Sequence, residues 1–125
     1  MTNFSVRRID QGAHFGEIFL DFRKMELSRA NEPVSLTLQE FKVLKFFVAR
    51  PEAVVSRRRL ISALWPKRAR SSYRTVDNCI AKLRQKIESN PECPAFLRTV
   101  YGVGYKFVPQ ADSERNRQTL HEQSS

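Results

Sequence analysis

Short stretches of alternating apolar and polar residues dominate the first third of the chain. They cover residues 14–22, 24–29 and 33–36 and are separated by turns that contain charged residues or Asn. Alternation with a period of two is typical of strands that bury one face, so these stretches predict a small antiparallel sheet. Residues 1–13 are polar and mixed, and we expect them to form a flexible segment before a domain that begins at residue 14.

Two segments with helical spacing come next. Thr37 and Glu40 form the T-x-x-E pattern of a capping box at the start of the first helix, and Pro51 ends that helix because proline has no amide hydrogen. Ser56 is a suitable N-cap for the second helix, which ends at Pro66. Each helix has an apolar stripe that we expect to face the core: Phe41, Leu44, Phe47 and Val48 in the first, and Leu60, Ile61, Leu64 and Trp65 in the second.

A third helix is predicted to begin after Ser71 or Ser72 and to run to about residue 89. Two stripes follow its length. The first is apolar and we expect it to be buried: Val76, Ile80, Leu83 and Ile87. The second is polar, contains no acid and is expected to face outward: Arg74, Asn78, Lys82 and Gln85.

A β-hairpin is predicted at the end of the domain, where residues 96–101 and 105–108 flank Gly102-Val103-Gly104. An N-terminal antiparallel sheet, three helices and a C-terminal hairpin in this order indicate an α+β winged helix-turn-helix domain over residues 14–109. The third helix is then the recognition helix and the hairpin is the wing. Residues 110–125 are almost entirely polar, and we expect a disordered tail there.

The chain is strongly basic, with 22 Lys and Arg residues, 13 acidic residues and a formal net charge of +9. The excess is concentrated between residues 57 and 86, where ten basic residues accompany a single acid, Asp77. Such a block fits a polyanionic partner, because basic side chains neutralise phosphates and release counterions. Composition alone favours an ordinary solvated basic face equally.

Other classes of function have little support. Cys79 and Cys93 lie in no CxxC pair and far from both histidines, so neither a metal site nor a cofactor is expected. The acids are too scattered for metal-dependent phosphoryl chemistry, and no nucleophile and base are paired, so we do not expect an enzyme. No apolar run is long enough to span a membrane and residues 1–10 have no signal-peptide core, so a cytoplasmic protein is expected.

Four segments resemble the effector domain of OmpR/PhoB-type response regulators: LTLQEFKVLKFFV (36–48), SRRRLISALW (56–65), RTVDNCIAKLRQKI (74–87) and TVYGVGYKF (99–107). The resemblance covers about residues 15–108. It implies a DNA-binding transcription regulator whose recognition helix, here about residues 72–89, enters the major groove. The wing, here residues 96–108, would reach the adjacent minor groove. It also implies tandem dimers on DNA and an RNA polymerase contact through the loop at residues 66–73.

The resemblance also implies individual DNA contacts. Arg74 and Thr75 match positions that hold phosphates, whereas Asn78, Ala81 and Lys82 match positions that face the major groove. Lys82 is the leading candidate for reading a base, because its ammonium group can reach O6 and N7 of guanine, and Asn78 is suited to adenine.

Wing residues and further basic residues complete the predicted contacts. Thr99 and Tyr105 match wing positions that contact the DNA backbone. Arg84 is expected to meet a phosphate or the edge of the core. The remaining candidates are Arg57, which serves as a phosphate clamp or a solvated helix start, Tyr101, and the loop residues Lys67, Arg68 and Arg70.

Three departures from the family pattern bear on function. Tyr101 replaces the arginine that the family commonly has before G-x-G-Y, and both groove contact and sheet packing are open to it. The loop at residues 66–73 has no acid, which favours phosphate contact over the usual polymerase contact. The usual receiver domain is missing, so if Met1 is the true start we expect no phosphorylation switch and a monomer in free solution.

The leading hypothesis is therefore a sequence-specific regulator that binds double-stranded DNA. The alternative is a protein-interaction module that binds RNA polymerase or another regulator and has only nonspecific affinity for DNA. The two differ in sequence preference and in how steeply DNA binding falls with salt.

Overall fold

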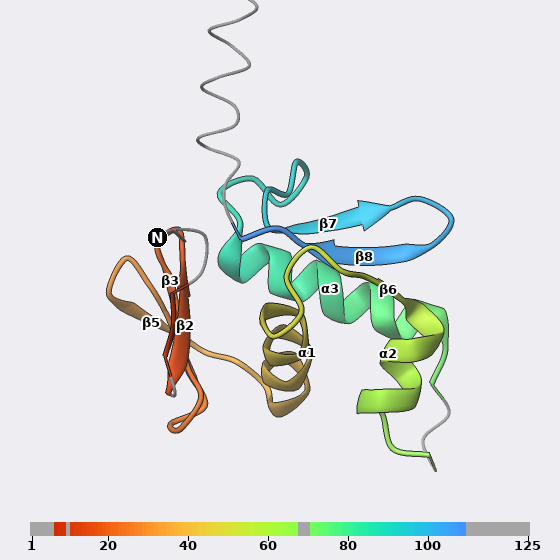
Figure 1. Cartoon of the computed structure of the whole chain (residues 1–125), viewed down its shortest axis with the longest axis horizontal. Coiled ribbons are helices and arrows are strands. Elements are labelled where there is room, and N and C mark those ends of the chain that lie inside the picture. The colour runs from red at the N-terminus through yellow and green to blue at the C-terminus, as the bar shows by residue number, and fades with distance from the viewer. Residues whose placement is uncertain (1–6, 10, 68–70, 110–125) are drawn as a thin grey trace, which may run out of the picture.

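The computed structural model describes residues 7–9, 11–67 and 71–109. Within these ranges the chain forms eight strands and three helices, arranged as two antiparallel sheets packed around the helices (Figure 1). The order of elements confirms the predicted winged helix-turn-helix fold. The predicted tail, residues 110–125, lies outside the described residues, as do Arg68 and Arg70 of the basic loop.

The N-terminal sheet has five strands in the described part of the chain, and each pairs antiparallel with the next: β1 (Arg7–Ile9), β2 (Gly12–Phe15), β3 (Ile18–Asp21), β4 (Glu26–Arg29) and β5 (Glu32–Val34). β1 and the start of β2 fall within residues 1–13, which the sequence predicted to be flexible. For these residues the prediction is wrong, because Ile9 pairs with Gly12 and Arg7 pairs with His14. An edge strand can be polar, since its pairing depends on backbone groups.

Residues 14–22, predicted as one strand, are divided between β2 and β3. Phe15 and Ile18 pair across a two-residue turn in which Gly16 has a φ of +57°. Glycine adopts this conformation without steric cost, and it is common at the first central position of tight hairpins. The buried positions change from odd (13 and 15) to even (18 and 20) across the turn, and this change of phase was the signal that the sequence analysis missed.

The three helices of the described chain are α1 (Leu38–Val48), α2 (Arg57–Leu64) and α3 (Tyr73–Ile87). Their predicted caps are confirmed: Thr37 and Glu40 form a capping box at α1, and the Ser56 side chain accepts a hydrogen bond at α2. Ser72, rather than Ser71, caps α3. α3 ends at Ile87, before the predicted residue 89, because the backbone is extended at Glu88.

The second sheet contains the predicted wing and one further strand. β7 (Leu97–Val100) and β8 (Gly104–Phe107) form the hairpin, and Gly102 in its turn has a φ of +80°. β6 (Val54–Ser56), between α1 and α2, pairs with the other side of β8, so the order is β6-β8-β7. The wing is therefore joined to the helix-turn-helix by backbone hydrogen bonds.

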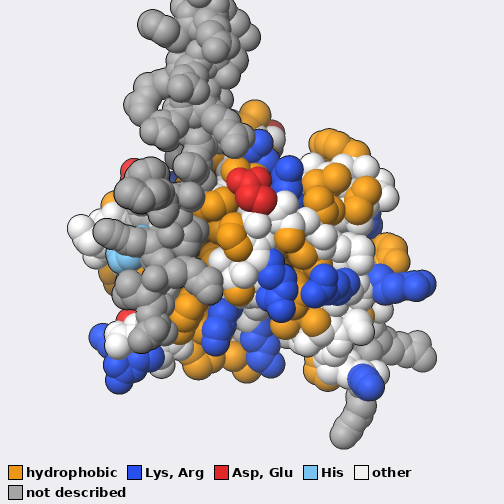
Figure 2. All heavy atoms as spheres, viewed as in Figure 1, with side chains coloured by type: hydrophobic (Ala, Val, Ile, Leu, Met, Phe, Trp, Pro, Cys, Tyr) orange, Lys and Arg blue, Asp and Glu red, His pale blue; other side chains and the backbone are white. Residues whose placement is uncertain are grey.

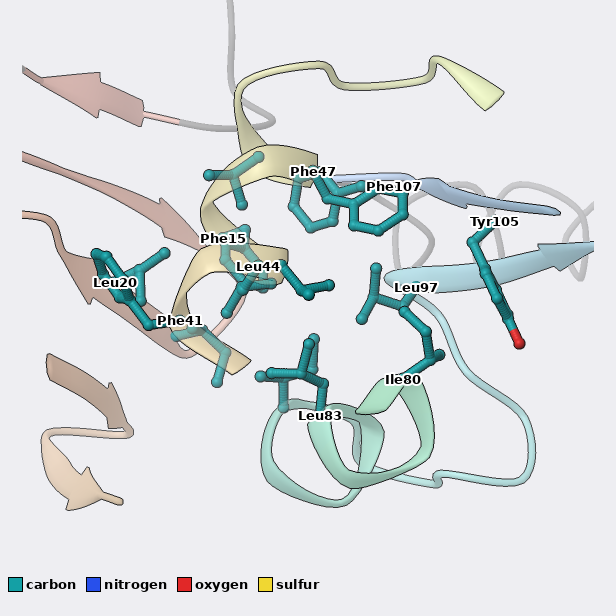
Figure 3. Close-up of a cluster of buried hydrophobic side chains, with 14 of the residues drawn as sticks. Phe15, Leu20, Phe41, Leu44, Phe47, Ile80, Leu83, Leu97, Tyr105 and Phe107 are labelled. Carbon is teal, nitrogen blue, oxygen red and sulfur yellow. The ribbon is translucent and has the colours of Figure 1, made fainter. Parts of the chain in front are cut away.

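The core lies where α1, α3 and both sheets meet (Figure 3). The predicted apolar stripes of α1 and α3 are buried, and they pack with Phe15 and Leu20 of the first sheet and with Leu97 and Phe107 of the second. In α2 only Leu60 of the predicted stripe is fully buried, and Ile61, Leu64 and Trp65 pack at the margin. No helix in the described residues is long and apolar enough to cross a membrane.

Candidate nucleic-acid interface

The polar stripe of α3 is presented to solvent because the opposite stripe is fixed in the core. Val76, Ile80 and Leu83 are completely buried. On the other side of the helix the side chains are exposed: Arg74, Asn78, Ala81, Lys82 and Gln85. The structure therefore brings together the phosphate and groove candidates that the sequence predicted on this helix, with the exception of Thr75 and Arg84.

Thr75 is half-buried and takes part in the cap of α3. Its amide donates to Ser72 Oγ over 3.4 Å, and its Oγ1 accepts from the Ser72 amide over 3.3 Å. These bonds fix the first turn of the recognition helix. The Thr75 side chain thus has a structural role that the sequence analysis did not assign to it.

The structure turns Arg84 inward, toward the wing. Its Nε donates to the carbonyl oxygen of Leu97 over 2.9 Å, and a terminal nitrogen donates to Thr99 Oγ1 over 2.9 Å. Its guanidinium also lies 5.4 Å from the centre of the Tyr105 ring. Of the two predicted roles, the structure places Arg84 at the edge of the core, where it ties α3 to β7.

Tyr105 makes a contact that the sequence did not predict. Only 7% of its surface is exposed, and its hydroxyl donates to Asp77 Oδ1 over 2.6 Å. Burial, this hydrogen bond and the negative charge of Asp77 raise the pKa of Tyr105 to about 12. In Figure 3 the ring lies at the margin of the apolar cluster. Tyr105 therefore joins β8 to α3 through a contact that the family resemblance had not implied.

Asp77, the single acid of the basic block, also pairs with Arg57 at the start of α2. The Arg57 guanidinium nitrogen lies 3.5 Å from Asp77 Oδ2, and its carbon lies 5.0 Å from the centre of the Tyr73 ring. A guanidinium has five N–H donors, so one bond to Asp77 leaves others for a phosphate. Both readings of Arg57 from the sequence, clamp and solvated helix start, are compatible with this geometry.

The tip of the wing is exposed. Tyr101 has 89% of its surface accessible and Val103 has 52%, which excludes sheet packing as the role of Tyr101. Thr99 accepts from Arg84 but retains its own hydroxyl hydrogen to donate. Lys67, at the start of the basic loop, is exposed. Figure 2 shows Lys and Arg side chains spread over the helical part of the molecule.

Cys79, beside the polar stripe of α3, adds no reactive site. Cys79 is half-buried on α3, and burial, followed by the charge of Glu40, raises the pKa of its thiol to about 11. It is therefore a thiol rather than a reactive thiolate at neutral pH. Among the described residues, no group of three or more His, Cys, Asp or Glu side chains could hold a metal ion.

Comparison with known proteins identifies the domain. A family described as "Transcriptional regulatory protein, C terminal" matches residues 31–107, which include α1–α3 and the wing. The chain belongs to this family. The match confirms the resemblance of the four motifs to effector domains of response regulators, and it covers the recognition helix and the wing described above.

Relatives in the transcriptional regulatory protein family come from several bacteria. The chain is 34% identical to the transcriptional regulatory protein AfsQ1 of Streptomyces coelicolor over 103 residues, which are 82% of this chain and 46% of AfsQ1. It is 35% identical to the DNA-binding response regulator MtrA of Mycolicibacterium smegmatis over 94 residues, or 75% of this chain and 41% of MtrA. The chain thus spans about half the length of the curated relatives it matches.

Solved structures of the family have the same fold. The response regulator DrrB of Thermotoga maritima, described as an OmpR/PhoB homolog, superposes with a TM-score of 0.73 at 30% identity, covering 78% of this chain and 44% of DrrB. The DNA-binding domain of Klebsiella pneumoniae RstA, solved with its RstA box, gives a TM-score of 0.71 at 26% identity. That match covers 80% of this chain and 99% of the RstA domain.

Proposed function

We propose that this protein is a sequence-specific transcription regulator that binds double-stranded DNA. α3 enters the major groove and the wing, β7 and β8, lies against the adjacent minor groove. Two relatives support the proposal: RstA is solved bound to its DNA box, and MtrA is a DNA-binding response regulator. The proposed activity is binding and regulation rather than catalysis.

One observation carries the proposal: the acid-free, exposed stripe of Arg74, Asn78 and Lys82 on a helix whose other side is fixed in the core. A helix fits the major groove of B-DNA, where the base edges present distinct donors and acceptors. The positive charge of Arg74, at the first turn of the helix, suits a phosphate, and Asn78 and Lys82 further along can form hydrogen bonds with base edges. Asp77, the one acid on α3, is paired with Arg57 and Tyr105.

Selection of bound duplexes from a random pool at near-physiological salt tests this proposal. We expect enrichment of direct repeats whose half-sites lie about one helical turn apart. Salt-sensitive binding without enrichment would contradict sequence-specific regulation and would direct the search to RNA polymerase as the partner.

Lys82→Ala tests the register of the recognition helix on the selected site. We expect the preference for that site over a scrambled duplex to fall by about tenfold, since a base contact in the major groove contributes roughly 1 to 3 kcal/mol of discrimination and a factor of ten corresponds to about 1.4 kcal/mol. Fluorescence anisotropy titrations of both duplexes measure the ratio. Lys24→Ala, which removes an exposed lysine from the β3–β4 turn, is the matched control. Unchanged selectivity in Lys82→Ala would show that another side chain reads the base.

Two finer features extend the proposal. A monomer in free solution assembles as a tandem head-to-tail dimer on DNA, and sedimentation of the protein with and without the selected duplex measures both states. A contact with RNA polymerase through residues 66–73 is testable by crosslinking from Lys67, the exposed first basic residue of that loop. A dimer without DNA, or no crosslink in an active promoter complex, would contradict the corresponding feature.

A further inference from the structure

An acidic side chain on a recognition helix needs an explanation. Asp77 lies one turn after Arg74 and next to Asn78, and 42% of its side chain is exposed. Near a duplex, an unpaired carboxylate at this position would repel phosphates and weaken binding to every DNA sequence. The contacts of Asp77 show what the protein uses this charge for.

The stronger contact joins Asp77 to the wing. The Tyr105 hydroxyl donates to Asp77 Oδ1 over 2.6 Å, and a bond of this length to a carboxylate is charge-assisted and strong. Tyr105 lies in the central strand of the second sheet, opposite Thr99 of β7 and opposite Val55 of β6. Fixing Tyr105 therefore fixes both outer strands of that sheet relative to α3.

The weaker contact joins Asp77 to the start of α2. The Arg57 guanidinium is 3.5 Å away and about a third exposed, so this ion pair by itself contributes little to stability. The pair does affect where Arg57 lies, because contacts with the Asp77 carboxylate and the Tyr73 ring, both on α3, hold the guanidinium beside that helix. Asp77 on α3 is thus the common partner of two other elements, β8 and α2.

Resting on the proposed function, we propose that Asp77 is a positioning residue that holds the wing and Arg57 in fixed register with the recognition helix, so that all three contact one specific duplex together. Arg84 provides a second tie between α3 and the wing, through Leu97 and Thr99. Together with the pairing of β8 with β6, these two ties at different points along α3 hold the wing in a fixed orientation relative to the helix. The negative charge of Asp77 weakens the attraction to DNA phosphates, and its positioning role increases the preference for one duplex over others.

The positioning role and simple electrostatics predict opposite changes in affinity for the selected duplex when Asp77 is removed. Loss of one negative charge beside DNA should tighten binding to all duplexes. Loss of a positioning residue should weaken binding to the selected site and leave nonspecific binding unchanged or tighter, because nonspecific binding requires no fixed register.

The experiment compares Asp77→Ala, Tyr105→Phe and the double variant on the selected duplex and on a scrambled duplex. Alanine favours a helix, and phenylalanine keeps the Tyr105 ring against Arg84, so both variants should fold. We expect each single variant to bind the selected duplex about tenfold more weakly, with no further loss in the double variant. Glu92→Ala, which removes an exposed acid from the loop before β7, should keep wild-type selectivity.

Parallel tightening on both duplexes in Asp77→Ala would overturn the proposal in favour of simple electrostatics. Equally weakened binding of Asp77→Ala to both duplexes, together with a lowered melting temperature, would also overturn the proposal, because that result would indicate general destabilisation. Additive losses in the double variant would show that Asp77 and Tyr105 act separately and would overturn the tie between them.

A second readout does not depend on DNA. In the free protein, amide hydrogen exchange in β7 and β8 should be faster in Asp77→Ala than in wild type, while exchange in α1 stays the same. Unchanged exchange in the wing overturns the inference. If the wild-type protein instead shows no sequence preference while the wing exchanges faster in the variant, the proposed function fails and the tie stands.

Discussion

Two glutamates in this domain are nearly completely buried. Glu40 has 3% of its surface exposed and Glu88 has 2%. The Glu88 carboxylate accepts from three consecutive backbone amides, those of Ala95, Phe96 and Leu97, at distances between 2.7 and 3.1 Å. It therefore closes the loop between α3 and β7 and sets where the wing begins. Neither carboxylate lies on the exposed polar stripe of α3.

Glu40 is held in its charged form by its surroundings. Its Oε1 accepts from Lys86 Nζ over 2.6 Å and from the Thr37 amide over 3.0 Å. Burial alone would raise the pKa of Glu40. These hydrogen bonds and the positive charges of Lys86 and Lys82 outweigh burial and hold the pKa below its ordinary value of 4.5.

Stability should therefore depend on pH through Glu40. Because its pKa is lower in the folded state, its contribution is present above about pH 4.5 and is lost as the pH falls through the folded value. We expect Glu40→Gln to lower the free energy of unfolding by about 2 kcal/mol at pH 7. The loss should shrink at acid pH, as measured by urea unfolding across the pH range. A difference that stays constant with pH would contradict this, and the exposed Glu32→Gln is the control.

At the scale of elements, the two glycines of the wing serve different purposes. Gly102 has a φ of +80° and nothing within 4 Å of where a Cβ would lie. At Gly104 a Cβ would collide with the carbonyl oxygen of Val55 in β6. Gly102 therefore permits the turn, whereas Gly104 permits β6 to pair with β8.

We expect the two alanine variants to differ in stability. Gly102→Ala should cost about 1 kcal/mol, which is the strain of a left-handed backbone in an open site. Gly104→Ala should cost about 3 kcal/mol, since the backbone of β6 must move away from β8 and the core residue Val55 moves with it. Chemical denaturation of both variants measures the difference, and equal losses would contradict the separate roles.

Sequence patterns within a few residues predicted the helices and strands well. They predicted few of the contacts between those elements. The caps at Thr37 and Ser56 and the apolar stripes were predicted because each depends on residues within a few positions of one another. The pairing of β6 with β8 joins residues about fifty positions apart, and nothing within Val54–Ser56 indicates its partner. The contacts of Tyr105 and Arg84 could not be predicted for the same reason, since their partners Asp77 and Thr99 lie on other elements.

For the whole molecule, the distribution of charge determines how binding responds to salt. The net charge is +9, and the basic residues concentrate on the part of the chain that contains α2 and α3. Each phosphate contact that is lost should reduce both affinity and the salt dependence of binding. This dependence separates side chains that position the duplex from those that read it.

Arg74→Ala tests this distinction. Arg74 is exposed at the first turn of α3, where we propose that it holds a phosphate. We expect Arg74→Ala to bind the selected and scrambled duplexes more weakly to the same extent. The slope of log affinity against log salt concentration should fall in magnitude by about 1. Anisotropy titrations at several salt concentrations measure the slope, with Lys24→Ala as the matched loss of charge. A loss confined to one sequence would contradict a phosphate contact.

The pairing of β6 with β8 also determines when this domain can complete its fold during synthesis. Residues 54–56 emerge from the ribosome early, but their partner strand, Gly104–Phe107, is the last element of the described domain. Until it arrives, β6 has an unpaired edge and Val55 lacks its place in the core, and such exposed strands favour aggregation. Complete burial of the helix-turn-helix core therefore depends on the wing that follows it in the sequence.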